Sequence, residues 1–246
     1  MQWSDEGIIL SVKAHGETAA IAEVFTRAHG RHLGMVHGGR SRKLRPVLQM
    51  GNHVDVTWKA RLAEQLGHVA VDLRKGYAAQ SMDDPLALAG LSSLCALARL
   101  LPERDPHPSL FEIALFVLGY LDEPEVWPAL MVRWELALLD ELGFGLDLST
   151  CAATGSNDNL IYVSPKSGRA VSESAGEDYK DRLLALPQFL SKARQGTTPT
   201  LADVIAGLEL TGHFLETRVL LPRSEVMPSA RVRFKDLMGR RAAQAA

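Results

Sequence analysis

Residues 52–60 read "NHVDVTWKA" and residues 67–73 read "GHVAVDL". In both stretches apolar residues alternate with polar ones, and the apolar positions are Val54, Val56, Trp58, Val69, Val71 and Leu73. A period of two is typical of a half-buried β-strand, because successive side chains point to opposite faces of a sheet. The two stretches therefore predict neighbouring strands that each bury one face.

The chain before these strands shows the same pattern. In residues 7–13, "GIILSVK", Ile8, Leu10 and Val12 share one face. Turn sequences rich in Gly and His separate the apolar stretches at residues 15–17, 29–31, 37–40 and 50–52. We therefore expect about five short antiparallel strands, which predict a small barrel. The OB-fold is the commonest barrel with this number of strands, and an SH3-like barrel fits the pattern almost as well.

The period changes after residue 80. Asp84 and Pro85 predict a helix start, since aspartate caps helix N-termini and proline fits the first helical position. Apolar residues then recur at three- and four-residue spacing, and similar patterns predict helices over about 108–121, 126–142 and 200–220. The sequence thus predicts an α+β protein with an OB-fold in residues 1–80 and an α-helical domain in residues 81–246.

Residues 146–176 interrupt the helices with a segment rich in Ser, Gly and Asn, which predicts turns around a small β-hairpin. A zinc ribbon would need two C-x2-C pairs. Cys151 could begin the first pair, but position 154 is threonine, and Ser172 and Ala175 stand at the second. We expect a zinc-knuckle-like hairpin without zinc ligands, held by hydrogen bonds and packing, and no metal or other cofactor.

The net charge of −2 conceals a segregation of charge along the chain. Residues 1–80 hold 11 Lys and Arg against 7 Asp and Glu, residues 81–212 hold 9 against 19, and residues 213–246 hold 7 against 3. Blocks of opposite sign predict different partners for different surfaces. Two cysteines and no long apolar run predict a soluble cytoplasmic protein without a membrane span.

The sequence contains no phosphate-binding loop, no G-x-S-x-G and no H-E-x-x-H, so we expect no catalytic residue and no enzyme. His29, His32 and His37 lie close in sequence, but His29 and His32 would point to opposite faces of an extended chain, and no metal site is expected.

Basic residues at strand ends are the remaining candidates for a site. The stretch "HGGRSRKLRPVL" at 37–48 places four cations after a glycine pair. If strand ends converge on one barrel face, these cations can neutralise phosphates. The predicted nucleic-acid-binding residues are Arg40, Arg42, Lys43, Arg45, Lys59, Arg61, Arg74 and Lys75.

Two further groups are weaker candidates. Phe25, Trp58 and Tyr77 offer rings on which bases could stack, although core packing is expected for the first two. A second cationic block could extend a nucleic-acid track or receive an acidic peptide, and it comprises Arg218, Arg223, Arg231, Arg233 and Lys235.

The sequence resembles the RecO family of bacterial recombinational-repair proteins over essentially its whole length. Residues 6–43, "EGIILSVKAHGETAAIAEVFTRAHGRHLGMVHGGRSRK", match the opening pattern of that family. "WELALLDELGFGLDLSTCAATG" followed by "YVSPKSGRAV" resembles its middle, where a helix runs into a zinc knuckle. The order and spacing of these loose motifs carry the resemblance.

The resemblance implies an N-terminal OB-fold, a C-terminal helical domain and a place at the nucleoid. It implies binding to single- and double-stranded DNA, strand annealing, and action with RecR to load RecA onto strands covered by single-strand-binding protein, whose acidic C-terminal tail is also bound. Many members have a four-cysteine zinc site, of which only Cys151 is present here. The alternatives are an RNA-binding OB-type module of translation or ribosome function, or an enzyme whose residues meet only in the fold.

Overall fold

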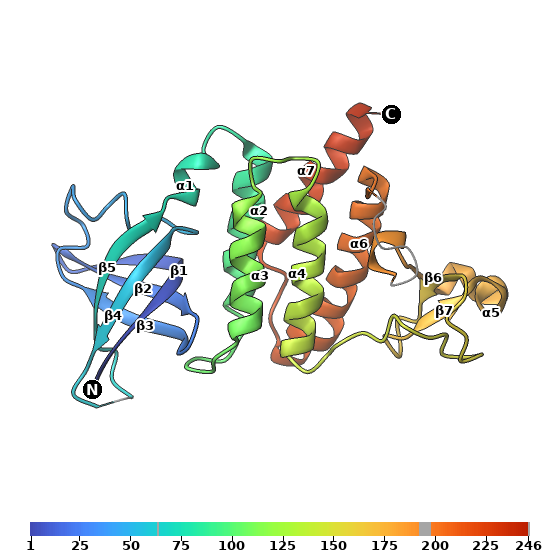
Figure 1. Cartoon of the computed structure of the whole chain (residues 1–246), viewed down its shortest axis with the longest axis horizontal. Helices are drawn as coiled ribbons and strands as arrows, with labels where there is room; N and C mark the ends of the chain where they lie inside the picture. The colour runs from blue at the N-terminus through green and yellow to red at the C-terminus, as the bar shows by residue number, and fades with distance from the viewer. Residues whose placement is uncertain (63, 192–197, 246) are drawn as a thin grey trace. The chain divides into compact units, whose positions relative to one another are not determined.

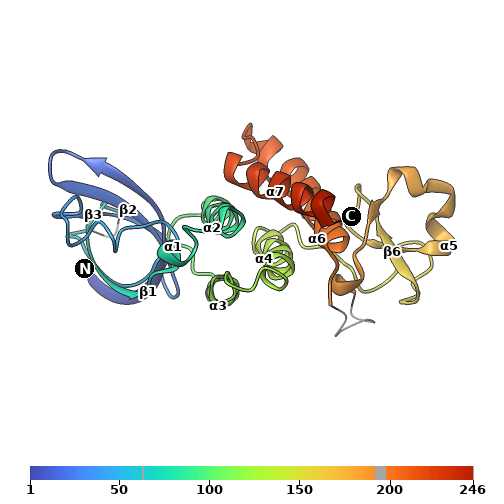
Figure 2. The same cartoon turned by 90° about the horizontal axis from the view of Figure 1, so that it is seen from above.

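The computed structural model describes residues 1–62, 64–191 and 198–245, which belong to two compact units, Met1–Trp127 and Pro128–Ala246 (Figure 1). The first unit begins with a closed five-stranded barrel in the order β1-β2-β3-β5-β4, seen from above in Figure 2. The strands are β1 (Gln2–His15), β2 (Ala19–Thr26), β3 (Gly30–Val36), β4 (His53–Lys59) and β5 (His68–Lys75). The predicted OB-fold followed by helices is confirmed.

The barrel core follows the predicted alternation in β4 and β5, with one exception. Val56 and Trp58 of β4 and Val71 of β5 are buried. Leu73 is 46% exposed, because the ladder shifts by one residue where β4 begins and the end of β5 leaves the core. In β1, all four residues from 7 to 10 are buried, since a bulge follows Ile9 and helix α2 (Pro85–Ala98) covers the strand from outside.

Two longer helices pack on the barrel and complete the first unit. After the short helix α1 (Tyr77–Gln80), the carboxylate of Asp84 accepts the backbone N–H of Leu86 at 2.8 Å and caps α2 as expected. Helix α3 (Pro108–Gly119) places Phe111 edge-on against Phe25 of the barrel, 5.5 Å between ring centroids. The strands of this unit end at Lys75 and its helices begin at Tyr77, and the compact unit continues to Trp127.

A buried carboxylate joins the barrel to α2. Glu23 of β2 is 3% exposed and accepts hydrogen bonds from Arg31 of β3, from Ser11 of β1 at 2.9 Å and from Arg99 after α2 at 2.7 Å. Arg31 also donates to the carbonyl of Leu101 at 3.0 Å. Burial raises the pKa of Glu23, but the hydrogen bonds from Arg31 and Ser11 and the charge of Arg99 outweigh it and hold the pKa below its ordinary value of 4.5.

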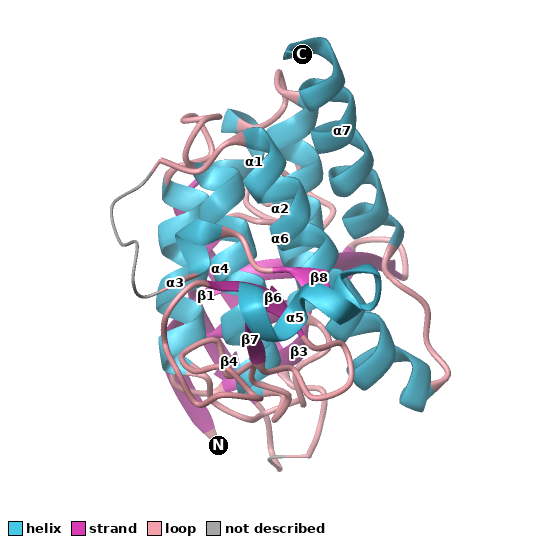
Figure 3. Ribbon diagram, turned by 90° about the vertical axis from the view of Figure 1, so that its right-hand side faces the viewer, coloured by secondary structure: helices cyan, strands magenta, loops and turns pink. Residues whose placement is uncertain are grey.

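The second unit combines helices with the predicted hairpin. The hairpin strands β6 (Leu160–Val163) and β7 (Ala170–Ser172) pair with each other, and β8 (Leu184–Ala185) pairs with β6. Figure 3 shows these strands in magenta beside α5. The helical segments are α4 (Trp127–Glu141), α5 (Glu173–Gly176), η1 (Glu177–Arg182), η2 (Gln188–Leu190), α6 (Leu201–Phe214), the π-helix η4 (Leu215–Leu220), η5 (Leu221–Arg223) and α7 (Ser229–Ala245).

Helix α7 was not expected from the sequence, and a buried ion pair fixes it. Arg231 of α7 is 2% exposed and its guanidinium donates to Glu135 of α4 at 2.5 and 3.0 Å. Thr211 of α6 donates to the same carboxylate at 2.5 Å, and the carbonyl of Leu208 accepts from Arg231 at 2.8 Å. One carboxylate thus ties three helices of the second unit together.

Replacing Glu23 with glutamine should lower the free energy of unfolding by about 3 kcal/mol at neutral pH, because Arg31 and Arg99 lose their buried counter-charge. The stabilisation is complete above the ordinary pKa of 4.5 and is lost as the pH falls through the lowered pKa of the folded state. Urea unfolding followed by circular dichroism at pH 7 and pH 3 measures the difference. The control variant Glu17→Gln, at an exposed position, should change the free energy of unfolding by less than about 0.5 kcal/mol. Equal effects at positions 17 and 23 would contradict the stabilising role given to the Glu23 ion pairs.

Arg231→Met alone should cost about 3–5 kcal/mol, because it leaves the Glu135 carboxylate buried without a partner. The double variant Arg231→Met with Glu135→Leu should recover most of that loss, since neither position then buries a charge. Thermal and urea unfolding of the two variants provide the comparison. A double variant no more stable than Arg231→Met would show that the ion pair is not what Arg231 contributes.

Candidate nucleic-acid interface

The loop from residue 37 to residue 52 has a defined structure that begins at its glycine pair. Gly38 has a φ of +62°, which side chains rarely allow, and a Cβ on Gly39 would come within 2.8 Å of Ala20. Helical hydrogen bonds follow, from the N–H of Arg45 to Ser41 at 3.0 Å and from that of Leu48 to Leu44 at 2.9 Å. Residues 41–48 of the loop therefore form helical turns, with the hydrogen-bond spacing of an α-helix.

One face of these helical turns packs on the barrel and turns the cations outward. Leu48 is 5% exposed in the barrel core, and Leu44 and Val47 pack against the same core. Because apolar residues occupy the inner face, the side chains between them point to solvent, and Arg42 and Lys43 are exposed. The apolar residues of the loop thus fix it to the barrel, while its cations remain exposed to solvent.

Arg40 and Arg45, also exposed, lie on the side of the loop that faces β1 and β2. Both line a hollow with Leu48 and Ala20. The guanidinium of Arg40 donates to the carbonyls of Gly16 and Glu17, each at 3.0 Å, and so joins this loop to the β1–β2 turn. Arg40 therefore has a structural contact that Arg42 and Lys43 do not make with any residue that the structure describes.

The other four predicted cations separate into two pairs. Lys59 and Arg61 are exposed at the end of β4, where Lys59 lies opposite His68. Arg74 and Lys75 end β5, where Lys75 lies opposite His53 at the far end of the same strand pair, about 20 Å away by strand rise. Arg74 and Lys75 therefore lie at the end of the β4–β5 pair opposite to Lys59, so the cations at strand ends do not all meet on one barrel face.

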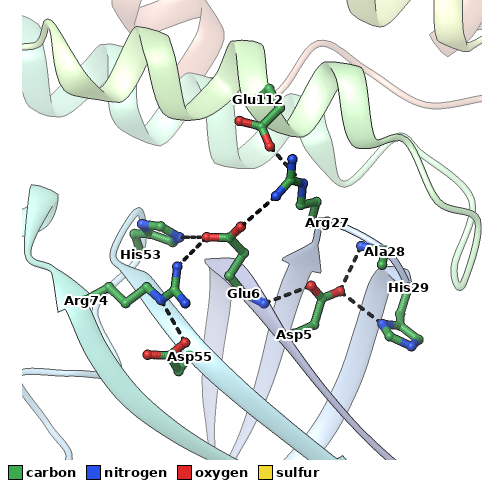
Figure 4. A network of polar contacts seen from close by, with 9 residues as sticks. All are labelled: Asp5, Glu6, Arg27, Ala28, His29, His53, Asp55, Arg74 and Glu112. Atoms are coloured by element: carbon green, nitrogen blue, oxygen red, sulfur yellow. Dashed lines mark hydrogen bonds and ion pairs between the residues drawn. The ribbon is translucent and has the colours of Figure 1, made fainter.

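Arg74 belongs to a network of ion pairs that joins β1, β4 and β5 and extends through Arg27 to helix α3 (Figure 4). Its guanidinium lies 2.6 Å from Glu6 and 2.7 Å from Asp55. Glu6 also contacts His53 at 3.0 Å and Arg27 at 3.3 Å, and Arg27 continues to Glu112 of α3 at 2.8 Å. Two carboxylates neutralise the charge of Arg74, which weakens it as a phosphate ligand. Lys75 lies over the ring of Tyr77, 4.8 Å from the ring centroid.

The three aromatic residues proposed for base stacking are buried. Phe25 is 0%, Trp58 2% and Tyr77 5% exposed. The expected core packing of Phe25 and Trp58 is confirmed, and Tyr77 of α1 is buried as well. The exposed rings beside the cationic loop are imidazoles instead: His37 and His68 stack with a centroid separation of 4.6 Å.

The other two histidines of the N-terminal cluster have structural partners. His29 lies in a turn, where its Nδ1 is 3.0 Å from Asp5, and it stacks on Trp3 at 4.1 Å. His32 meets the same Trp3 edge-on at 5.0 Å. Trp3 therefore contacts both imidazoles, His29 by stacking and His32 edge-on. No group of three metal-ligating side chains occurs among the described residues.

The second cationic block does not form one surface. Arg231 is buried in the ion pair with Glu135, so its predicted role in binding a nucleic acid or an acidic peptide is wrong. Arg218 of η4 donates to the carbonyl of Lys166, and Lys235 of α7 lies 3.3 Å from Glu209 of α6. The remaining members, Arg223 and Arg233, are exposed.

The turns of the predicted zinc-knuckle-like hairpin face each other, but their side chains do not fit zinc. Cys151 is buried, its Sγ lies 3.4 Å from the hydroxyl of Ser172, and it accepts the N–H of Ser172 at 3.3 Å. Thr154 and Ala175 complete the four positions and offer no thiolate. Burial raises the pKa of the Cys151 thiol, but hydrogen bonds from Ser172 and Thr154 lower it to about 6. Hydrogen bonds take the place of a metal in closing this hairpin.

Comparisons with known proteins cover almost the whole chain. Residues 1–77 match the family described as recombination protein O N terminal, and residues 82–225 match recombination protein O C terminal. The chain is 58% identical to a DNA repair protein RecO of Methylobacterium nodulans over 95% of this chain and 96% of that protein. It is 54% identical to the protein of that name from Rhodospirillum centenum over 96% of this chain and 94% of that protein. The chain belongs to the RecO family of DNA repair proteins.

Proposed function

We propose that this protein is a recombination mediator that binds single- and double-stranded DNA and anneals complementary strands without nucleotide hydrolysis. The observation that carries the proposal is the exposure of the cations in the loop at 40–45. Apolar residues of the loop pack on the barrel core, and among the described residues Arg42, Lys43 and Arg45 form no ion pair with a carboxylate. Lys59 at the end of β4 lines one hollow of the barrel together with Leu44 of the loop, and the exposed Arg61 follows Lys59 by two residues.

These exposed cations suit annealing because annealing needs only two polyanions held close with their bases accessible. Lys and Arg neutralise phosphates without reading sequence, so binding should depend steeply on salt. Membership in the family supports the further proposal that the protein acts with RecR to load RecA onto strands covered by single-strand-binding protein, whose acidic tail it would bind. In this proposal the protein is not an enzyme, and it works at the nucleoid. No described helix is long and apolar enough to cross a membrane.

The triple variant Arg42→Ala, Lys43→Ala and Arg45→Ala should weaken binding to both single- and double-stranded DNA. If each cation neutralises one phosphate, the slope of log K against log salt should fall in magnitude by about 2 for single-stranded DNA and by about 2.7 for double-stranded DNA. Arg40 is left in place because it holds the β1–β2 turn. Fluorescence anisotropy over a salt series measures both effects.

The matched control is Lys166→Ala, Lys180→Ala and Arg182→Ala, which removes three exposed cations from the second unit. It should leave the affinity nearly unchanged and the slope intact. If both triple variants lose the same affinity, binding depends on overall charge and the loop has no special role. If neither loses affinity, the loop does not bind DNA.

The wild-type protein should anneal complementary DNA oligonucleotides without ATP, and it should bind oligo(dT) at least as well as oligo(U). A fluorescence-quenching assay with labelled strands follows annealing, and anisotropy compares the two homopolymers. The loop variant should anneal more slowly, and the control variant should match wild type. A clear preference for oligo(U) together with no annealing would contradict the proposal and favour an RNA-binding module.

A further inference from the structure

A groove of about 410 Å³ lies beside the cationic loop on the barrel. Val36 at the end of β3, Val69 and Val71 of β5 and Leu44 of the loop supply apolar surface. Lys59, Thr57 and Asp72 supply polar groups. An apolar groove of this size with a few polar groups at its edge is the usual form of a site for a small molecule.

The groove follows the weakest seam of the barrel. Strands β3 and β5 are in register at a single pair, Met35 and His68, whereas the other neighbouring strands pair along most of their length. A further hydrogen bond joins the N–H of Met35 to the carbonyl of Gly67 at 3.0 Å. Because the two strands do not continue to pair, the residues on either side of this point line a groove instead of an unbroken sheet.

Two stacked imidazoles line this groove. The rings of His37 and His68 are 4.6 Å apart between centroids with planes inclined by 19°, and both side chains are exposed. His37 directly follows β3 and His68 begins β5, so the barrel positions both rings. A solvent-exposed, pre-positioned aromatic surface is what an unstacked base requires, and histidine is among the side chains on which bases stack.

The charges around the groove fit a strand with its base turned inward. Lys59 lines the groove beside His68, and Lys43 and Arg45 flank Leu44 on the loop. These cations can hold the phosphates on either side of an inserted nucleotide. Asp72 repels a phosphate from the groove itself, but a carboxylate can accept a hydrogen bond from an N–H group of a base, the ring N–H of thymine included.

We propose that this groove takes one unpaired base of single-stranded DNA, which stacks on the His37–His68 pair while Lys59 and the loop cations hold the flanking phosphates. The inference rests on the proposed function and deepens it, because it assigns base contact to residues other than the phosphate-binding cations. It also predicts a preference for unpaired over paired bases at this position, since a base inside a duplex cannot reach the groove.

The test uses the full-length protein and labelled oligo(dT), a matched oligomer of abasic residues and a DNA duplex. His37→Ala with His68→Ala should weaken oligo(dT) binding about tenfold, within the range measured for one base–aromatic stack. The salt slope should stay unchanged because no phosphate contact is lost. Binding to the abasic oligomer and to the duplex should equal that of wild type.

His37→Phe with His68→Phe should bind oligo(dT) within about twofold of wild type, because the rings that stack are kept. His213→Ala, which removes a histidine from the second unit, is the control and should have no effect. Thermal unfolding checks that each variant is folded, and the oligo(dT) to abasic ratio of wild type tests base contact without any substitution.

Equal binding of wild type to oligo(dT) and to the abasic oligomer would overturn the groove proposal and leave the proposed function intact. The groove proposal is also overturned, with the proposed function intact, if the alanine variant binds oligo(dT) as tightly as wild type, a result that would favour a peptide as the occupant of the groove. The same conclusion follows if the alanine variant loses affinity equally for oligo(dT), the abasic oligomer and the duplex. Failure of wild type to bind any of the three would overturn the proposed function and the groove proposal together.

Discussion

The arrangement of the first unit depends on one buried carboxylate. Glu23 lies on a barrel strand, yet one of its two arginine partners, Arg99, follows a helix that packs outside the barrel. A charge that is 3% exposed is stable only if its partners stay in place. Glu23 therefore requires β2, β3 and the end of α2 to keep one geometry, and Arg31 reinforces it by donating to Leu101 beyond α2.

The same requirement sorts the cations of the barrel into two classes. Glu6, Glu23 and Asp55 hold arginines that stiffen the unit, and Arg74 is one of these. Arg42, Lys43 and Arg45 are positioned instead by their apolar neighbours Leu44 and Leu48, which pack on the barrel and leave the three charges exposed to solvent. A chain with a net charge of −2 can therefore present a local surface that suits a polyanion.

Much of the fold was predictable from the sequence, and the exceptions have physical causes. Alternation identified β4 and β5 because each buries one face, and Asp84 with Pro85 marked α2 because capping is a local interaction. Alternation failed in β1, where a helix covers the outer face. Helix α7 was missed because its five cations obscure the apolar spacing of Phe234 and Met238, which lie four residues apart and are both fully buried.

The candidate site was predictable only in part, because charge in a sequence does not reveal its partner. In the sequence, Arg74 and Arg231 lie among other cations just as Arg42 does. In the fold, contacts with residues distant in sequence pair Arg74 with Glu6 and Arg231 with Glu135. The glycine pair before the loop was a sound local signal, since Gly38 needs its positive φ. His37 and His68 lie 31 positions apart and meet only through the closure of the barrel between β3 and β5. That closure makes the stacked pair a property of the barrel, so any shift of β5 along β3 that disrupts the groove must also separate the two rings.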